Sequence, residues 1–253
     1  MHHRILKSIL AGSLAVATFI AGAERLQATL LNYAHLEPND PNGSVILSDL
    51  LNGEIPGIVV GDKIFSQFFY STLPNDDMPE AQDVEVFGFQ DLDGNYGLSF
   101  HGVFWDLADG KPSDALLRFT VEVTPQAIAE GWRISDAHLF LGGLGIGTNS
   151  FLAVDESFQG LNETLNTYAT TLGDEPDQVL SDWVDFSQLY TSLRVTKDIL
   201  AFSGDGRVPV RVSVIDQSFS QTLIPEPTSL AALTIFGLGL ILARRRPPPR
   251  DGS

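Results

Sequence analysis

Apolar and polar residues alternate along much of the chain. Val208, Val210, Val212 and Val214 occupy every second position of one segment, and mostly polar residues separate them. A period of two predicts a strand with one face against the core. Pro209 falls on the outward face and has no N–H to donate, so we expect this strand to begin irregularly or to lie near a sheet edge.

Strand patterns of this kind recur in eight further segments, and turns rich in Asp, Asn and Gly separate them. Nine or ten strands, with 16 Phe residues to fill an interior, predict an all-β fold, namely an antiparallel β-sandwich or jelly roll. The eight segments are residues 63–71, 83–86, 96–100, 116–123, 133–141, 151–157, 164–171 and 192–202.

Helical signals are few. One helical turn is expected at residues 48–52 and another at residues 125–130, where Thr124 would cap the helix and Pro125 would take its first position. No amphipathic run of ten or more residues lies between the strand segments, which argues against a parallel sheet with crossover helices.

The N-terminus follows the pattern of a secretory signal peptide. Arg4 and Lys7 precede an apolar stretch at residues 9–21, and small residues suited to cleavage follow it. The stretch is too short to span a membrane, so a cleaved signal helix within residues 1–28 is predicted.

The C-terminus carries a second apolar segment. The uncharged run at residues 228–243 has Pro225-Glu226-Pro227 before it and Arg244-Arg245-Arg246 after it. Sixteen helical residues measure about 24 Å, less than the ~30 Å hydrocarbon core, so a transient anchor is favoured over a permanent one. The arginines should remain on the cytoplasmic side.

This order of Pro-Glu-Pro, short apolar helix and arginine cluster resembles the PEP-CTERM sorting signal of exported bacterial proteins. The resemblance implies processing near Pro225-Glu226-Pro227 by an exosortase, a membrane enzyme similar to a cysteine transpeptidase. It also implies that Arg244, Arg245 and Arg246 help to halt passage through the inner membrane. The chain departs from that pattern by continuing through residues 247–253, for which we expect a disordered cytoplasmic tail.

Parts of the body also resemble exported proteins with this signal. Residues 48–53 and 60–68 resemble one recurring segment, and residues 195–199 and 217–221 resemble later ones. The resemblance implies no activity. It implies a compact β domain at residues 29–223 that leads directly into a sorting signal at residues 224–246.

The charge of the body limits its partners. The chain has 32 acidic and 15 basic residues, but seven of the basic and three of the acidic residues lie outside residues 29–223. The body therefore carries 29 acidic and 8 basic residues, and we expect it to repel nucleic acid and anionic lipid. The chain has no cysteine, which excludes disulfides, thiolate metal sites and a thiol nucleophile.

One turn offers ligands for a small ion. Asp91 and Asp93 stand two positions apart in Asp91-Leu92-Asp93-Gly94-Asn95, and Asn95 adds a third oxygen. These residues are a candidate calcium site, although the terminal Glu of the complete calcium loop is missing. A tight hairpin turn is the alternative, since Asp-Gly-Asn favours that geometry.

Aromatic residues offer a surface for sugars. Trp105, Trp132 and Trp183, with Tyr168 and Tyr190, could form a platform for stacking, and core packing is the other common use of such residues. Trp132 follows a glycine in an apparent turn between strands. It is therefore the tryptophan that we expect to be exposed and to bind a ligand.

No motif indicates an enzyme. The glycine-rich residues 142–147 lead into a strand and lack the lysine of a phosphate loop, and no Gly-x-Ser-x-Gly elbow occurs. His35, His101 and His138 do not form a pair at metal-binding spacing. We therefore expect an exported surface or extracellular-matrix protein without enzymatic activity. Its expected partners are signal peptidase and the export machinery, an exosortase-type enzyme and the inner membrane. The first alternative is a module for carbohydrate binding or calcium-assisted adhesion in the extracellular polymer layer, and the second is a glycan-acting enzyme on a jelly roll.

Overall fold

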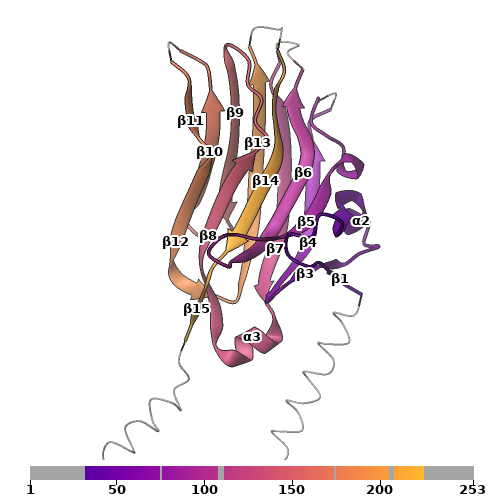
Figure 1. Ribbon diagram of the computed structural model, residues 1–253, viewed down its shortest axis with the longest axis vertical. Coiled ribbons are helices and arrows are strands. Elements are labelled where there is room, and N and C mark those ends of the chain that lie inside the picture. The colour runs from indigo at the N-terminus through magenta and orange to yellow at the C-terminus, as the bar shows by residue number, and fades with distance from the viewer. Residues whose placement is uncertain (1–31, 75, 108–110, 174, 205–207, 225–253) are drawn as a thin grey trace, which may run out of the picture.

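Two β-sheets face each other along the long axis of the molecule (Figure 1). The computed structural model describes residues 32–74, 76–107, 111–173, 175–204 and 208–224. In this part of the chain, no helix is long and apolar enough to cross a membrane. The predicted signal peptide, the apolar helix at residues 228–243 and the tail at residues 247–253 all lie outside it.

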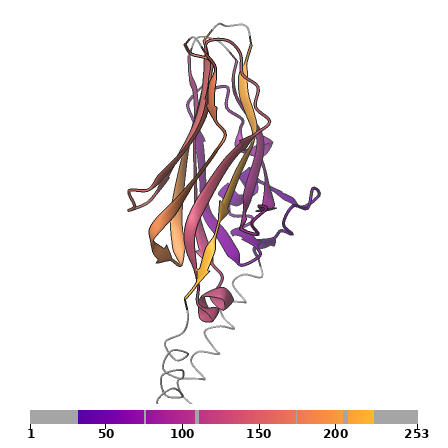
Figure 2. The ribbon, with the colours of Figure 1, turned by 60° about the vertical axis from the view of Figure 1, so that its left-hand side comes forward.

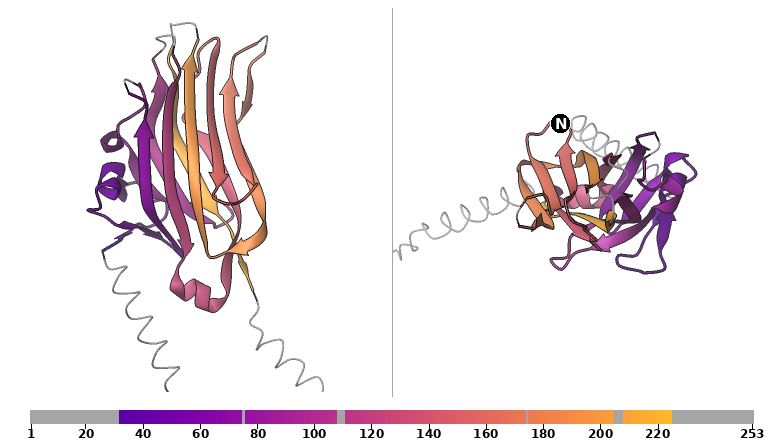
Figure 3. Two further views of the ribbon diagram at one scale, coloured as in Figure 1. Left: turned by 180° about the vertical axis from the view of Figure 1, so that it is seen from behind. Right: turned by 90° about the horizontal axis from the view of Figure 1, so that it is seen from above.

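One sheet has eight strands, and Figure 3 shows it from its outer side in the left-hand view. All neighbouring strands are antiparallel except β1 and β3, which are parallel. Their order is β1 (Ala34–His35), β3 (Gly57–Val60), β4 (Lys63–Thr72), β7 (Ser113–Val123), β13 (Ser192–Ser203), β9 (Ser150–Phe158), β10 (Thr164–Thr170) and β11 (Asp177–Val179).

The other sheet has seven strands and is antiparallel throughout. Six of them run in the order β12 (Ser181–Tyr190), β8 (Trp132–Gly142), β14 (Val210–Phe219), β6 (Tyr96–Asp106), β5 (Glu85–Gln90) and β2 (Ser44–Ile46). The seventh, β15 (Gln221–Leu223), continues from β14 and pairs with the first residues of β8.

Apolar side chains from both sheets fill the space between them. In strand β7, the apolar side chains at every second position are buried in this core: Ala115, Leu117, Phe119, Val121 and Val123. Aromatic rings join the sheets across this core: the ring centroid of Phe119 lies 5.9 Å from that of Phe100 on β6. The predicted β-sandwich with one core is confirmed.

The helices are short, as predicted. Helix α2 covers Leu47–Leu51, and α3 covers Pro125–Glu130, with a 3-10 turn at Ala81–Asp83. The Thr124 side chain caps α3 by accepting a hydrogen bond from the Ala127 N–H. Helix α3 lies at one end of the sandwich beside β15 (Figures 1 and 2), where the Ile224 N–H donates to the Gly131 carbonyl.

The valine-rich segment differs from its predicted alternation. Strand β14 begins at Val210, so Pro209 precedes it, and Val208 is exposed. The pairing with β6 shifts between Val212 and Val214, which turns Val214 away from the core. Of the two expected alternatives, the start after Pro209 agrees with an irregular beginning, whereas the edge position is wrong, because β14 lies between β8 and β6.

Ten of the fifteen strands in the described residues have six or more residues, which agrees with the predicted number. The other five strands have two to four residues and carry too short a pattern to be recognised. Strand β12 is the one long strand that was not predicted. Its residues are mostly exposed, and its five apolar residues do not follow a period of two: Trp183, Val184, Phe186, Leu189 and Tyr190.

Candidate functional site

The outer face of the seven-stranded sheet brings several polar and aromatic side chains together. On β8, Ala137 and Leu139 point into the core, so His138 and Phe140 point outward. The register pairs His138 with Trp183 of β12. Paired residues of an antiparallel sheet project from the same face, so Trp183 also points outward.

Trp183 and Phe140 form an exposed pair of aromatic residues, called here the aromatic pair. Their exposed fractions are 62% for Trp183 and 46% for Phe140. Phe140 pairs with Ser181, two residues before Trp183, so the two aromatic residues are diagonal neighbours about 7–8 Å apart. Strand β12 is the last strand of its sheet and contacts β10 of the other sheet, where the Asn166 N–H donates to Asp182 Oδ2 at 2.9 Å.

His138 has a hydrogen-bonded network beside the aromatic pair. Its Nε2 lies 3.0 Å from Asp136 Oδ1 and 3.4 Å from Ser220 Oγ. The hydrogen bond to Asp136 raises the pKa of His138, and the carboxylates of Asp91 and Asp93 add to this effect. Burial alone would raise the pKa of Asp136, but the hydrogen bonds from His138 and Ser220 outweigh it and lower the pKa.

The Asp91 turn joins β5 to β6 and packs against β14. Asp91 Oδ1 accepts hydrogen bonds from the backbone N–H groups of Asp93 and Asn95, at 3.0 and 2.9 Å. Its Oδ2 accepts from Asn95 Nδ2 at 3.0 Å and from Ser218 Oγ at 2.7 Å. Burial would raise the pKa of Asp91, but these hydrogen bonds together lower it.

This geometry is that of the hairpin turn, which was the alternative to a calcium loop. All four hydrogen bonds use the oxygens of Asp91 that a metal ion would need. Across the described ranges, no group of three His, Asp or Glu side chains could hold a metal ion. The calcium site at Asp91, Asp93 and Asn95 therefore stays a prediction that the observed contacts do not favour.

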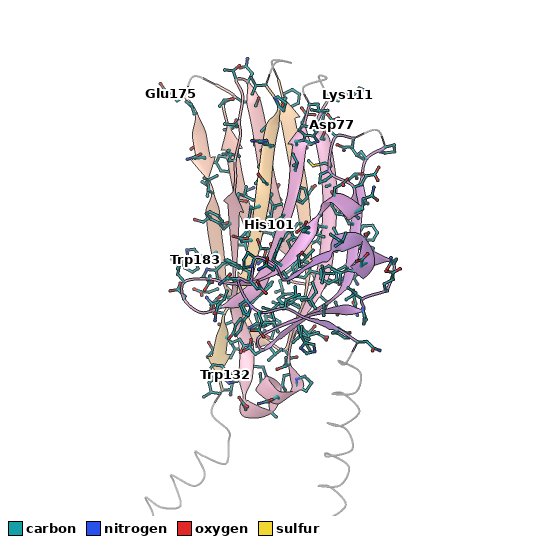
Figure 4. All side chains as sticks on the ribbon, turned by 45° about the vertical axis from the view of Figure 1, so that its right-hand side comes forward. Asp77, His101, Lys111, Trp132, Glu175 and Trp183 are labelled. Atoms are coloured by element: carbon teal, nitrogen blue, oxygen red, sulfur yellow. The ribbon has the colours of Figure 1, made fainter. Side chains whose placement is uncertain are left out.

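The prediction that Trp132 is the exposed tryptophan is wrong. Trp132 is half-buried and packs against the core, because β15 continues past β14 and pairs Leu223 with it. Trp183 is the exposed residue instead. Figure 4 shows Trp132 near α3 and Trp183 higher on the sandwich, and the six positions from Trp132 to His138, the partner of Trp183, correspond to about 20 Å of strand.

The remaining aromatic candidates do not join the aromatic pair. Trp105 is half-buried on β6, and the hydroxyl of Tyr168 on β10 donates to Asp177 at 2.7 Å. Tyr190 packs edge-on against Phe186, with ring centroids 5.7 Å apart. Sequence reasoning missed Phe140 because it lies inside a strand with strong alternation. Its position between the buried residues Leu139 and Leu141 does indicate that it faces outward.

The sorting residues Pro225, Glu226, Pro227, Arg244, Arg245 and Arg246 lie outside the described residues. Their predicted role stays a prediction.

Comparisons with known proteins give fold-level similarity alone. No protein-family model matches the chain, and no curated protein matches it. Among solved structures, TmCBM61 in complex with β-1,4-galactotriose is 14% identical with a TM-score of 0.30, and the match covers 61% of this chain and 90% of that one. The mannan-recognising carbohydrate-binding module TmCBM27 is 9% identical with a TM-score of 0.27, over 70% of this chain and 96% of that one.

A third match is the enzymatically active domain of tailspike protein 4 of bacteriophage CBA120. It is 11% identical with a TM-score of 0.25, and the match covers 62% of this chain and 19% of that one. At these scores the function has to be argued from the residues of the chain itself.

Proposed function

We propose that this protein is exported by its N-terminal signal, is sorted by its PEP-CTERM-like tail to the cell surface or extracellular matrix, and there binds neutral polysaccharide through the aromatic pair. The observation that supports binding is the exposure of Trp183 and Phe140 side by side on an open sheet face. An indole or phenyl face stacks on the apolar C–H face of a sugar ring, and solvent-exposed aromatic residues are otherwise unfavourable.

Polar groups around the aromatic pair suit sugar hydroxyls. Ser181 and Asp216 are the cross-strand neighbours of Phe140, and His138 lies between Trp183 and Ser218. Carboxylates accept hydrogen bonds from hydroxyl groups, and the hydroxyl of the exposed Ser181 both donates and accepts. The excess of acidic residues in the body disfavours anionic polymers, so neutral glycans are the expected ligands.

The proposal assigns no catalytic activity to the cluster of Ser220, His138 and Asp136. In a hydrolytic triad the carboxylate binds one imidazole nitrogen and the serine binds the other. Here both Asp136 and Ser220 contact Nε2 of His138, so the histidine cannot relay a proton between them in this arrangement.

Glycan-array binding tests the ligand class, using the full chain on arrays that carry both neutral and uronic-acid glycans. We expect binding to neutral glycans, and Trp183→Ala should weaken it about tenfold or more, since exposed aromatic anchors contribute at least ~1.4 kcal/mol. Trp132→Ala is the matched control and should leave affinity unchanged. Equal loss in both variants, or binding to uronic-acid glycans alone, would refute the aromatic pair as the site.

Cell fractionation tests the sorting signal. Replacing Arg244, Arg245 and Arg246 with neutral residues should abolish retention of the tailed precursor in the membrane, because the positive cluster is what opposes translocation. Unchanged membrane retention of this variant would argue against the sorting proposal without affecting the glycan proposal.

A further inference from the structure

Three polar side chains meet in the interior of the sandwich, away from the outer face described above. Lys197 and Gln217 are fully buried, and Glu156 is 1% exposed. Lys197 on β13 and Glu156 on β9 are direct cross-strand partners in the eight-stranded sheet. Gln217 comes from β14 of the opposite sheet, so the cluster bridges the two layers.

The amine of Lys197 is in contact with both other side chains. Its Nζ donates to Glu156 Oε2 and to Gln217 Oε1. The other oxygen of the carboxyl group, Glu156 Oε1, and the amide nitrogen, Gln217 Nε2, are buried and complete no hydrogen bond. Buried polar atoms are almost always paired, so two orphan atoms in one cluster need a chemical explanation.

Burial in apolar surroundings disfavours charge on this pair. It lowers the pKa of Lys197, and it raises the pKa of Glu156 even though Lys197 and the Gln217 side chain oppose this rise. The surroundings therefore favour transfer of the ammonium proton to the carboxylate. Where this proton is transferred, a neutral amine, which is a nucleophile, lies beside a carboxylic acid, which is a proton donor.

We propose that Lys197 and Gln217 form an intramolecular amide bond, with Glu156 as the catalytic acid and base. The amine, the carboxamide and the acid are already in contact in a site that excludes water, and such proximity replaces an encounter between separate molecules. Gln217 is assigned as the electrophile because Lys197 contacts its carbonyl oxygen while its Nε2, the leaving nitrogen, is held by no partner.

The atoms balance without an external reagent. Lys197 Nζ attacks Gln217 Cδ while Glu156 donates its proton to Gln217 Nε2, which gives a tetrahedral intermediate with a protonated leaving nitrogen. Glu156 then takes a proton from Nζ, and the leaving Nε2 departs as ammonia when the Cδ–Nε2 bond breaks. The products are one secondary amide and one ammonia molecule, and Glu156 returns to its starting protonation state.

Such a bond would join the two sheets covalently. It would connect β13 to β14 across the core and close a loop between residues 20 positions apart. A chain without cysteine has no disulfide to stabilise it outside the cell. An amide bond would fill that role and resist reduction.

Lys63 provides a matched control within the described part of the chain, since it is also buried, with 1% of its side chain exposed. Its contact is with Asp62, the preceding residue, at 2.9 Å, and that carboxylate is 31% exposed. No carboxamide contacts Lys63 Nζ among the hydrogen bonds of this region, so it has a carboxylate partner but no electrophile with a leaving nitrogen.

Mass spectrometry of the wild-type full chain tests the proposal directly. We expect a mass lower than that of the sequence by one ammonia molecule. Tryptic digestion should leave Lys197 uncleaved and should yield a branched product that joins the peptide beginning at Val195 to the peptide beginning at Val212. Peptide mapping is needed because cyclisation at an Asn-Gly sequence such as Asn42-Gly43 also releases ammonia.

Two variants assign the roles. Lys197→Arg keeps a cation without a primary amine, and Glu156→Gln keeps the side-chain volume without an acid. Both should have the mass of the unlinked chain, whereas Lys63→Arg should retain the bond. Glu156→Gln should also melt roughly 5–10 °C lower, because the unfolded chain regains loop entropy.

Three results would overturn the assignment. An unmodified wild-type mass with cleavage after Lys197 would show that no bond forms. A mass lower by one water molecule would place the amide on Glu156 instead of Gln217. A bond that persists in Glu156→Gln would remove the catalytic role of the acid. The wild-type measurement does not depend on whether any variant folds.

Discussion

The two faces of strand β14 place polar side chains in different environments. Asp216 and Ser218 lie on the outer face, where Ser99 donates to Asp216 and Ser218 donates to Asp91. Gln217, between them, points into the core and meets Lys197 from the opposite sheet. Asp216 is partly exposed and Ser218 is 2% exposed, and each has a hydrogen-bond partner on a neighbouring strand or turn, whereas Gln217 depends on a single cluster.

This difference separates two kinds of function. On the outer face, Ser181 is exposed and Asp216 and His138 are partly exposed beside the aromatic pair, and their arrangement suits the proposed reversible binding. An unpaired polar group costs several times more free energy in the core than at the surface. A buried cluster is therefore expected either to neutralise its charges and pair its polar atoms or to react. In the two proposals, one strand contributes to a binding surface on one side and to a buried reactive cluster on the other.

The largest expected effect comes from breaking the inner cluster. Glu156→Ala should reduce the free energy of unfolding by about 3–5 kcal/mol, because it removes the partner of a buried amine and leaves a cavity. Urea unfolding followed by circular dichroism measures this change.

Asp155 is the matched control, because it is adjacent on β9 but exposed on the other face, where it accepts a hydrogen bond from Asn166. Asp155→Ala should reduce the free energy of unfolding by less than about 1 kcal/mol. Equal losses at the two positions would show that the faces do not differ energetically.

The inner cluster could have been suspected from the sequence. Lys197 stands between Val195 and Ile199 at the core phase of its strand, and Gln217 stands likewise between Ile215 and Phe219. Alternation alone thus places both residues inside. It does not show that the two strands face each other, because strand order across two sheets depends on contacts far apart in the chain.

The second prediction tests the Asp91 turn on the outer side. Asp91→Ala removes four hydrogen bonds and should reduce the free energy of unfolding by about 1–3 kcal/mol. If the turn is held by these bonds alone, millimolar Ca²⁺ should leave the melting temperature of the wild type unchanged. A rise with Ca²⁺ that Asp91→Ala abolishes would instead support the calcium site.

The outer site was harder to predict than the core. The turn sequence Asp91-Leu92-Asp93-Gly94-Asn95 allowed a hairpin turn or an ion loop, and the donation from Ser218, 127 residues away, was not visible in the sequence. The exposure of Trp183 depends on β12 being an edge strand, and the burial of Trp132 depends on β15. Local pattern decides which face a residue takes, while exposure depends on what the rest of the chain covers.

The third prediction concerns pH. The pKa of His138 is raised from 6.5 in the folded protein, so its contribution to stability is complete below pH 6.5 and is lost as the pH rises through the folded pKa. The pKa of Asp136 is lowered from 3.8, so its contribution is present above pH 3.8 and is lost as the pH falls through the folded pKa.

His138→Gln keeps a donor for Asp136 but cannot be protonated. The wild type should therefore be more stable than this variant by about 0.5–1 kcal/mol between pH 4 and 6.5, and the difference should disappear in alkaline solution. Urea unfolding at a series of pH values measures the difference. A constant difference at all pH values would mean that His138 contributes through packing and not through its charge.

The smallest effect on stability is expected at the aromatic pair. Trp183→Ala should change the free energy of unfolding by no more than about 0.5 kcal/mol, because the side chain is 62% exposed and makes few contacts to lose. Trp132→Ala should reduce the free energy of unfolding by more, on the order of 1–2 kcal/mol, because Trp132 packs against the core. The order is reversed for glycan binding, where Trp183 matters and Trp132 does not. A large loss of stability in Trp183→Ala would show that the indole is needed for the fold of β12, and the exposed face would then lose its interpretation as a binding surface.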